Sequence, residues 1–91
     1  MSSLGDVAVV FRILPENPDE DIDELASRVK DTVTGKCEIN RVITEEIAFG
    51  LKAIRLEIIV PDEEGLMGAI ESDLASVSGV SQVDTEDVTL I

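Results

Sequence analysis

The fold of this chain is decided where two apolar runs meet, in the stretch Glu46-Ile47-Ala48-Phe49-Gly50-Leu51-Lys52-Ala53-Ile54. The run after it predicts a strand from Leu51 to Val60, because alternate apolar residues there share one face and Pro61 ends the pattern. The run before it, Glu38 to Phe49, predicts a second strand whose imperfect alternation is typical of a sheet edge or an irregularity. A turn near Phe49-Gly50 should join the two strands.

Working outward, Val7 to Leu14 is apolar except for Arg12. Such a run predicts a strand buried on both faces and therefore central in a sheet, with Pro15 and Pro18 ending it. A last strand is predicted from Val80 to Leu90, although its alternation is poor around Asp84 to Asp87.

Two helices are predicted between these strands. The first has an apolar stripe at helical spacing, Ile22, Leu25, Ala26, Val29 and Val33. Asp21 followed by Glu24 favours a start there, Asn17 with Pro18 is a rival start, and Gly35 is the natural stop. The second helix should run from about Glu64 to Ser76, before Gly79, with an inner stripe of Met67, Ile70, Leu74 and Val77.

The predicted order is βαββαβ. Right-handed split crossovers then place both helices on one face of a four-stranded antiparallel sheet. This is an α+β sandwich of the ferredoxin-like class, and residues 1–91 are expected to form a single domain.

Composition excludes several functions. Twenty acidic and seven basic residues give a net charge of −13, which opposes direct binding of nucleic acid. The acidity either reflects a solvated surface, steers the chain toward a basic partner, or suits a salt-rich cytosol. No apolar run is long enough to span a membrane, so no membrane contact and a cytoplasmic location are expected.

The usual catalytic groups are missing. The chain has no histidine, no phosphate-binding glycine loop and one cysteine, Cys37, which by itself forms neither an internal disulfide nor a tetrathiolate site. We therefore expect no enzyme activity, no cofactor and no metal. The acidic groups Asp62-Glu63-Glu64 and Asp19 to Glu24 are better explained as charged helix starts than as cation sites.

Phe49 and Lys52 are the candidate functional residues. Phe49, one of two aromatic residues, stands beside Gly50 at the expected hairpin tip. It either anchors a partner or folds back over the end of the sheet. Lys52 is the only lysine in the second half of the chain and is either a contact residue or an ordinary surface lysine.

Almost the whole chain resembles the archaeal elongation factor 1-beta family. The segments that carry the resemblance are Asp6 to Leu14, Leu14-Pro15-Glu16-Asn17-Pro18-Asp19, Ile47 to Ile54, Asp62-Glu63-Glu64-Gly65, Gly79-Val80-Ser81-Gln82-Val83 and Glu86-Asp87-Val88. Each segment is short, and the resemblance lies in their order and spacing. The chain is also similar to the catalytic C-terminal domain of the eukaryotic factor.

The resemblance implies a ferredoxin-like domain that binds elongation factor 1-alpha and promotes exchange of its GDP for GTP, as a monomer when free. It implies one contact region of Ala48, Phe49, Gly50, Leu51 and Lys52, and another at the C-terminal end, Thr89, Leu90 and Ile91. Eukaryotic members end in a basic residue assigned to displacing magnesium, and this chain ends without one.

Two other functions are also compatible with the sequence. The chain is alternatively a small-molecule-binding regulatory module of the same fold class, which would bind its ligand at a dimer interface. It is also compatible with an adaptor that binds the G protein without altering nucleotide release.

Overall fold

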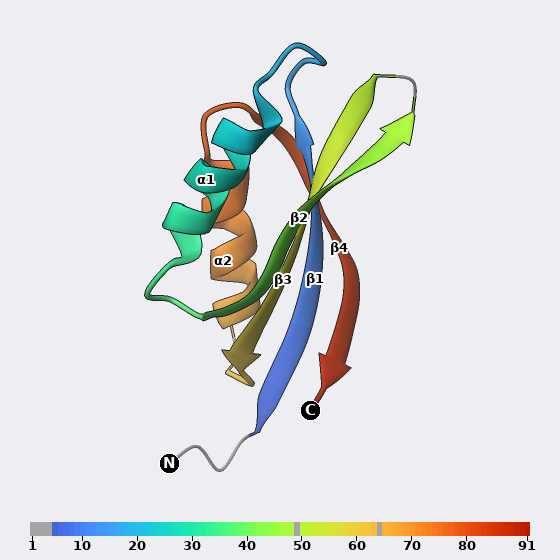
Figure 1. Cartoon of the computed structure of the whole chain (residues 1–91). Helices are drawn as coiled ribbons and strands as arrows, with labels where there is room; N and C mark the ends of the chain where they lie inside the picture. The colour runs from blue at the N-terminus through green and yellow to red at the C-terminus, as the bar shows by residue number, and fades with distance from the viewer. Residues whose placement is uncertain (1–4, 49, 64) are drawn as a thin grey trace.

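A computed structural model describes residues 5–48, 50–63 and 65–91. Its elements follow the predicted βαββαβ order. They are β1 (Asp6–Pro15), α1 (Ile22–Val33), β2 (Glu38–Ala48), β3 (Leu51–Pro61), α2 (Leu66–Ala75) and β4 (Val80–Leu90). Both helices cover the same face of one sheet (Figure 1), which confirms the predicted α+β sandwich.

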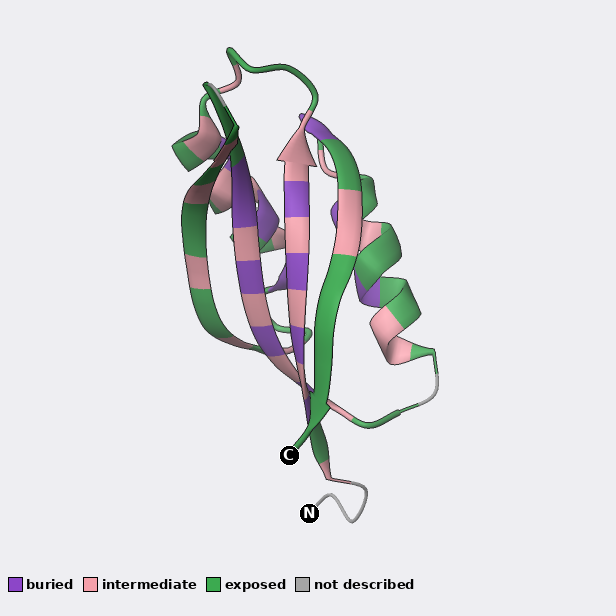
Figure 2. Cartoon of the chain, turned by 90° about the vertical axis from the view of Figure 1, so that its right-hand side faces the viewer, coloured by how far each residue is buried: buried purple, intermediate pink, exposed green. Residues whose placement is uncertain are grey.

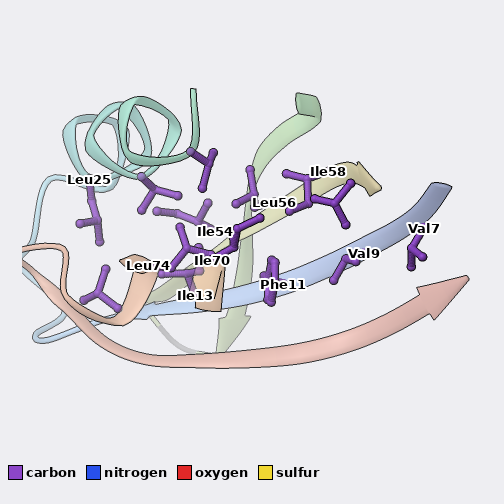
Figure 3. Packing of buried hydrophobic residues seen from close by; sticks show 14 residues of the cluster. Val7, Val9, Phe11, Ile13, Leu25, Ile54, Leu56, Ile58, Ile70 and Leu74 are labelled. Atoms are coloured by element: carbon purple, nitrogen blue, oxygen red, sulfur yellow. The ribbon is translucent and has the colours of Figure 1, made fainter. Parts of the chain in front are cut away.

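The sheet has the strand order β2-β3-β1-β4, and all its pairs are antiparallel. β1 is central as predicted, and β2 is an edge strand as predicted. Val9 pairs with Ile58, Phe11 with Leu56, and Ile13 with Ile54. These six side chains are buried on the face that the helices cover, and they form the centre of the core (Figure 3).

Helix α1 begins where the capping pattern predicted. The Asp21 carboxylate accepts hydrogen bonds from the backbone N–H groups of Asp23 and Glu24, both at 3.2 Å, and so satisfies two donors of the first turn. The rival start at Asn17 is wrong, because the Asn17 side chain instead accepts from the Asp19 N–H in a turn, at 3.1 Å. The helix ends at Val33, just before Gly35.

Helix α2 buries Ile70 and Leu74, and Met67 and Val77 pack against the core, as the predicted stripe requires. It begins at Leu66 after Gly65 and ends at Ala75, so it is slightly shorter than predicted. Glu64, the predicted first residue, lies outside the described residues. Among the helices described, none has the length and apolar character needed to cross a lipid bilayer.

The second face of the sheet is open. Figure 2 shows β1 and β3 with alternating buried and intermediate residues and β4 largely exposed. The prediction that Val7 to Leu14 is buried on both faces is wrong, because Ala8, Val10 and Leu14 are only half-buried there. Neighbouring side chains shield them in part, and no further layer covers them within the described chain.

The edge strands are irregular. Register shifts leave one extra residue in β2 at Asn40 and another at Ile47, and one in β4 at Ser81 and another at Glu86. The shift at Glu86 explains why the alternation around Asp84 to Asp87 was poor. The extra residue at Glu86 also brings its carboxylate to 3.7 Å from Arg12 on β1.

Gly79 provides a test of the loop that leads into β4. Its φ is +98°, and a Cβ there would lie 2.5 Å from Glu20 Oε1 and 3.1 Å from the buried Leu25. Gly79→Ala is therefore expected to lower the free energy of unfolding by about 1–3 kcal/mol, measured by urea denaturation.

Gly68 is the matched control. It lies within α2, and a Cβ there would meet no atom within 4 Å. Gly68→Ala is expected to raise the free energy of unfolding by about 0.5–1 kcal/mol, because glycine is a poor helix former. A Gly79→Ala protein as stable as the parent would contradict the prediction that a Cβ at this position is strained and clashes with Glu20 and Leu25.

Candidate functional site

The β2–β3 hairpin forms one end of the molecule. Ala48 pairs with Leu51, so residues 49 and 50 make the connection, and Gly50 has a φ of +70°. A two-residue hairpin loop requires such positive φ values, which glycine adopts without strain. The turn predicted near Phe49-Gly50 is confirmed. Phe49 itself lies outside the described residues.

Four of the predicted contact residues in this region are described, and all four are exposed. They are Ala48, Gly50, Leu51 and Lys52. Exposure at a hairpin tip leaves their side chains and backbone accessible to a partner.

A pocket of about 200 Å³ lies beside this hairpin. Three segments that are distant in sequence form its walls: the end of β1 with the loop that follows it, the residues on either side of the β2–β3 turn, and the start of β4. The lining residues are Leu14, Pro15, Glu16, Asn17, Pro18, Ile47, Leu51, Lys52 and Ser81. Two of the predicted contact residues, Leu51 and Lys52, thus belong to a concave site, which we call the hairpin-end pocket.

Hydrogen bonds hold the loop that forms one wall of the hairpin-end pocket. The Glu16 N–H donates to the Gly79 carbonyl oxygen at 2.9 Å, and the Glu20 N–H donates to the Asn17 carbonyl oxygen at 3.2 Å. Arg28 on α1 donates to the Ser78 carbonyl oxygen and contacts the Glu20 carboxylate at 3.2 Å. The loop after β1 and the loop before β4 are therefore tied together.

The predicted C-terminal contact residues lie at the opposite end of the sheet. Leu90 pairs with Val7, and the Ile91 N–H donates to the Asp6 carbonyl oxygen at 2.9 Å. The side chains are poorly covered, since Leu90 is 69% and Ile91 68% exposed, and Thr89 is exposed as well. Figure 1 shows the hairpin and the C-terminus at the two ends of the long axis, which measures 44 Å.

The structure thus separates the two predicted contact regions. Sequence reasoning also assigned no site role to Ile47, Ser81 or the loop from Leu14 to Pro18, which it noted only as parts of a resemblance. The two prolines after a buried strand were the available signal, because they make a rigid loop at a sheet end.

Lys52 differs from most basic residues of the chain because it forms no ion pair with a described residue. Within the described chain, Arg12, Arg28, Lys36 and Arg55 each form an ion pair with a carboxylate. No such pair is formed by Lys52 among these residues. It is the one basic residue in the described lining of the hairpin-end pocket, where Glu16 supplies the opposite charge.

Metal and thiol chemistry receive no support from the described residues. No group of three histidine, cysteine, aspartate or glutamate residues is placed to hold a metal ion in this part of the chain. Burial raises the pKa of the Cys37 thiol, which lies 3.7 Å from the Val33 carbonyl oxygen. A raised pKa reduces the fraction of thiolate, which is the nucleophilic form of cysteine.

Residues 8–91 match the model of one protein family, the EF-1 guanine nucleotide exchange domain. Over 88 residues the chain is 46% identical to elongation factor 1-beta of Thermoplasma acidophilum, a match that covers 97% of this chain and 100% of that protein. Elongation factor 1-beta of Methanothermobacter thermautotrophicus is 34% identical over 85 residues, covering 93% of this chain and 96% of that protein.

Solved structures match in fold. The ACT domain from GTP pyrophosphokinase of Chlorobium tepidum superposes with a TM-score of 0.66 at 18% identity, covering 89% of this chain and 99% of that domain. The C-terminal domain of the MgtC protein from Mycobacterium tuberculosis gives a TM-score of 0.62 at 8% identity, covering 94% and 90%. At these identities the likeness is one of fold alone.

The Cys37 environment predicts slow alkylation. At pH 8, iodoacetamide should modify the native chain several-fold more slowly than the urea-unfolded chain, because burial raises the thiol pKa and lowers the thiolate fraction. Mass spectrometry of timed samples measures the rate, with a short cysteine peptide in the same urea concentration as the control. Equal rates for the native and unfolded chains would contradict the prediction.

Proposed function

The chain belongs to the family of EF-1 guanine nucleotide exchange domains, and we propose from this that it promotes exchange of GDP for GTP on elongation factor 1-alpha. The observation that carries the proposal is the match to the family model over residues 8–91, which includes the hairpin, the hairpin-end pocket and the C-terminal end. The two relatives named elongation factor 1-beta are matched over 96–100% of their own length, so the likeness extends over nearly the whole of each.

Exchange of this kind requires binding energy and no covalent step. A protein that binds the nucleotide-free G protein more tightly than the nucleotide-bound form must weaken nucleotide affinity by the same factor, because the two equilibria are linked. A chain without histidine, whose half-buried thiol has a pKa raised by desolvation, suits that role. We propose that the chain acts by differential binding and not as an enzyme.

We propose that the hairpin end, with Ala48, Phe49, Gly50, Leu51 and Lys52, and the C-terminal end, with Thr89, Leu90 and Ile91, both contact the G protein. Because these ends lie along a 44 Å axis, the partner would contact two places along the length of the sheet. The C-terminal end carries apolar side chains and no basic group, so its contribution would come from packing.

The setting of the reaction is also a proposal. We propose a cytoplasmic location, which the family role in translation supports, and we propose that the chain is a monomer when free. A net charge of −13 opposes contact with phosphate backbones, and it favours fast association with a partner surface that is locally basic.

The proposed activity predicts faster nucleotide release. Purified archaeal elongation factor 1-alpha loaded with a fluorescent GDP analogue should lose it faster when this chain is added at substoichiometric concentration. Buffer and the same concentration of the urea-unfolded chain, diluted into the assay, serve as controls. Binding without acceleration would contradict the proposal and identify an adaptor, whereas amino-acid-dependent dimerisation would identify a regulatory module.

Phe49 is predicted to be an anchor of the complex. Phe49→Ala is expected to weaken binding to elongation factor 1-alpha by about 1–3 kcal/mol with little change in the unfolding midpoint, since buried aromatic anchors dominate interface energies. Calorimetric titration measures the affinity. Ile43→Ala, at an exposed apolar residue halfway along β2, is the matched control. Unchanged affinity with lost stability would make Phe49 a core residue.

A further inference from the structure

Two separate irregularities in the sheet converge on the hairpin-end pocket. In β2, Ile47 is the extra residue between the pairs Glu46–Lys52 and Ala48–Leu51. In β4, Ser81 is the extra residue between the pairs Leu14–Gln82 and Pro15–Val80. Both extra residues line the pocket, although their strands are the two opposite edges of the sheet. Bulges commonly redirect a side chain next to a functional site.

Two prolines and several hydrogen bonds restrict the movement of one wall of the pocket. Its outer wall contains Pro15 and Pro18, whose φ angles are fixed by their rings. The backbone bond from Glu16 to Gly79 and the contacts of Arg28 with Glu20 and Ser78 attach that wall to the rest of the molecule. A rigid concave surface binds with less loss of conformational entropy than a mobile one.

Its size and lining suit one side chain. A volume of about 200 Å³ is smaller than the roughly 300–1,000 Å³ of pockets that enclose whole small molecules. Leu14, Pro15, Pro18, Ile47 and Leu51 give it apolar walls. Such a pocket resembles the cavities at protein interfaces that receive a single anchoring residue.

Lys52 indicates the charge of the group that would lie beside a side chain bound in the pocket. It lines the pocket, is exposed, and forms no ion pair among the described residues, while four of the seven basic residues do. In a chain of net charge −13, such a lysine beside an apolar pocket is available to pair with a carboxylate of a bound protein.

We propose that the hairpin-end pocket receives an apolar side chain of the G protein, and that Lys52 pairs with a carboxylate beside that side chain. This inference rests on the proposed function, because the partner is elongation factor 1-alpha. It adds a concave anchor site, formed by the loop after β1 and the two bulges, to the hairpin tip itself.

Filling the pocket tests the inference. Ser81→Trp places a large side chain in the lining, and Ser72→Trp places the same side chain at an exposed position on α2. We expect Ser81→Trp to weaken binding to archaeal elongation factor 1-alpha about 10- to 100-fold, and Ser72→Trp to change it less than about two-fold. Circular dichroism and thermal unfolding check that both variants fold.

The charge is tested without altering the pocket's volume greatly. Lys52→Met should weaken binding at low salt and reduce the salt dependence of the affinity, because it removes the pair with the partner carboxylate. Lys30→Met is the matched control, since Lys30 is an exposed lysine on α1 without an ion pair in the described chain. The comparison of Lys52→Met with Lys30→Met tests the pocket inference even if Ser81→Trp does not fold.

The outcomes separate the two proposals. If the parent chain accelerates GDP release and Ser81→Trp, correctly folded, binds as tightly as the parent, the pocket inference is wrong and the proposed function stands. The same holds if Lys52→Met and Lys30→Met behave alike. If the parent chain neither binds nor accelerates release, both proposals are overturned.

Discussion

The pairing of β1 with β3 is the constraint on which the rest of the structure depends. Val9, Phe11 and Ile13 lie opposite Ile58, Leu56 and Ile54, and all six side chains point under the helices. Because side chains alternate along a strand, a slip of one residue would carry this whole apolar set to the open face. The register is therefore strongly specified, and it determines which segments meet at each end of the sheet.

The edge strands β2 and β4 contain the irregularities in strand pairing, whereas the central pair, β1 and β3, is regular. All four register shifts involve β2 or β4, and none interrupts the ladder between β1 and β3. An extra residue at an edge costs little core packing, whereas the same insertion in a central strand would disturb both neighbours. Ile47 and Ser81 are placed in the hairpin-end pocket by these shifts, so its lining uses the irregular parts of the sheet while the core stays regular.

A protein that acts by binding needs surfaces and not reactive groups, and the composition agrees with this. Most basic residues are paired with carboxylates, which leaves few free cations on a strongly acidic chain. Lys30, Arg41 and Lys52 form no ion pair within the described chain, and of these three Lys52 is the one that lines the hairpin-end pocket. Family membership supplies the identity of the partner, while the geometry supplies the places that are concave, exposed or apolar enough to contact it.

Local pattern alone was sufficient for the element order, the central and edge strands, the Asp21 cap and the hairpin turn, because each depends on side-chain periodicity or on turn chemistry within a few residues. It failed on the burial of Val7 to Leu14, since an apolar run does not show whether a second layer exists. Phe49 and Lys52 were found as candidates from their types and position. The hairpin-end pocket and the placement of Lys52 and Leu90 at opposite ends of the sheet were decided by tertiary structure, because both arise from register between strands distant in the chain.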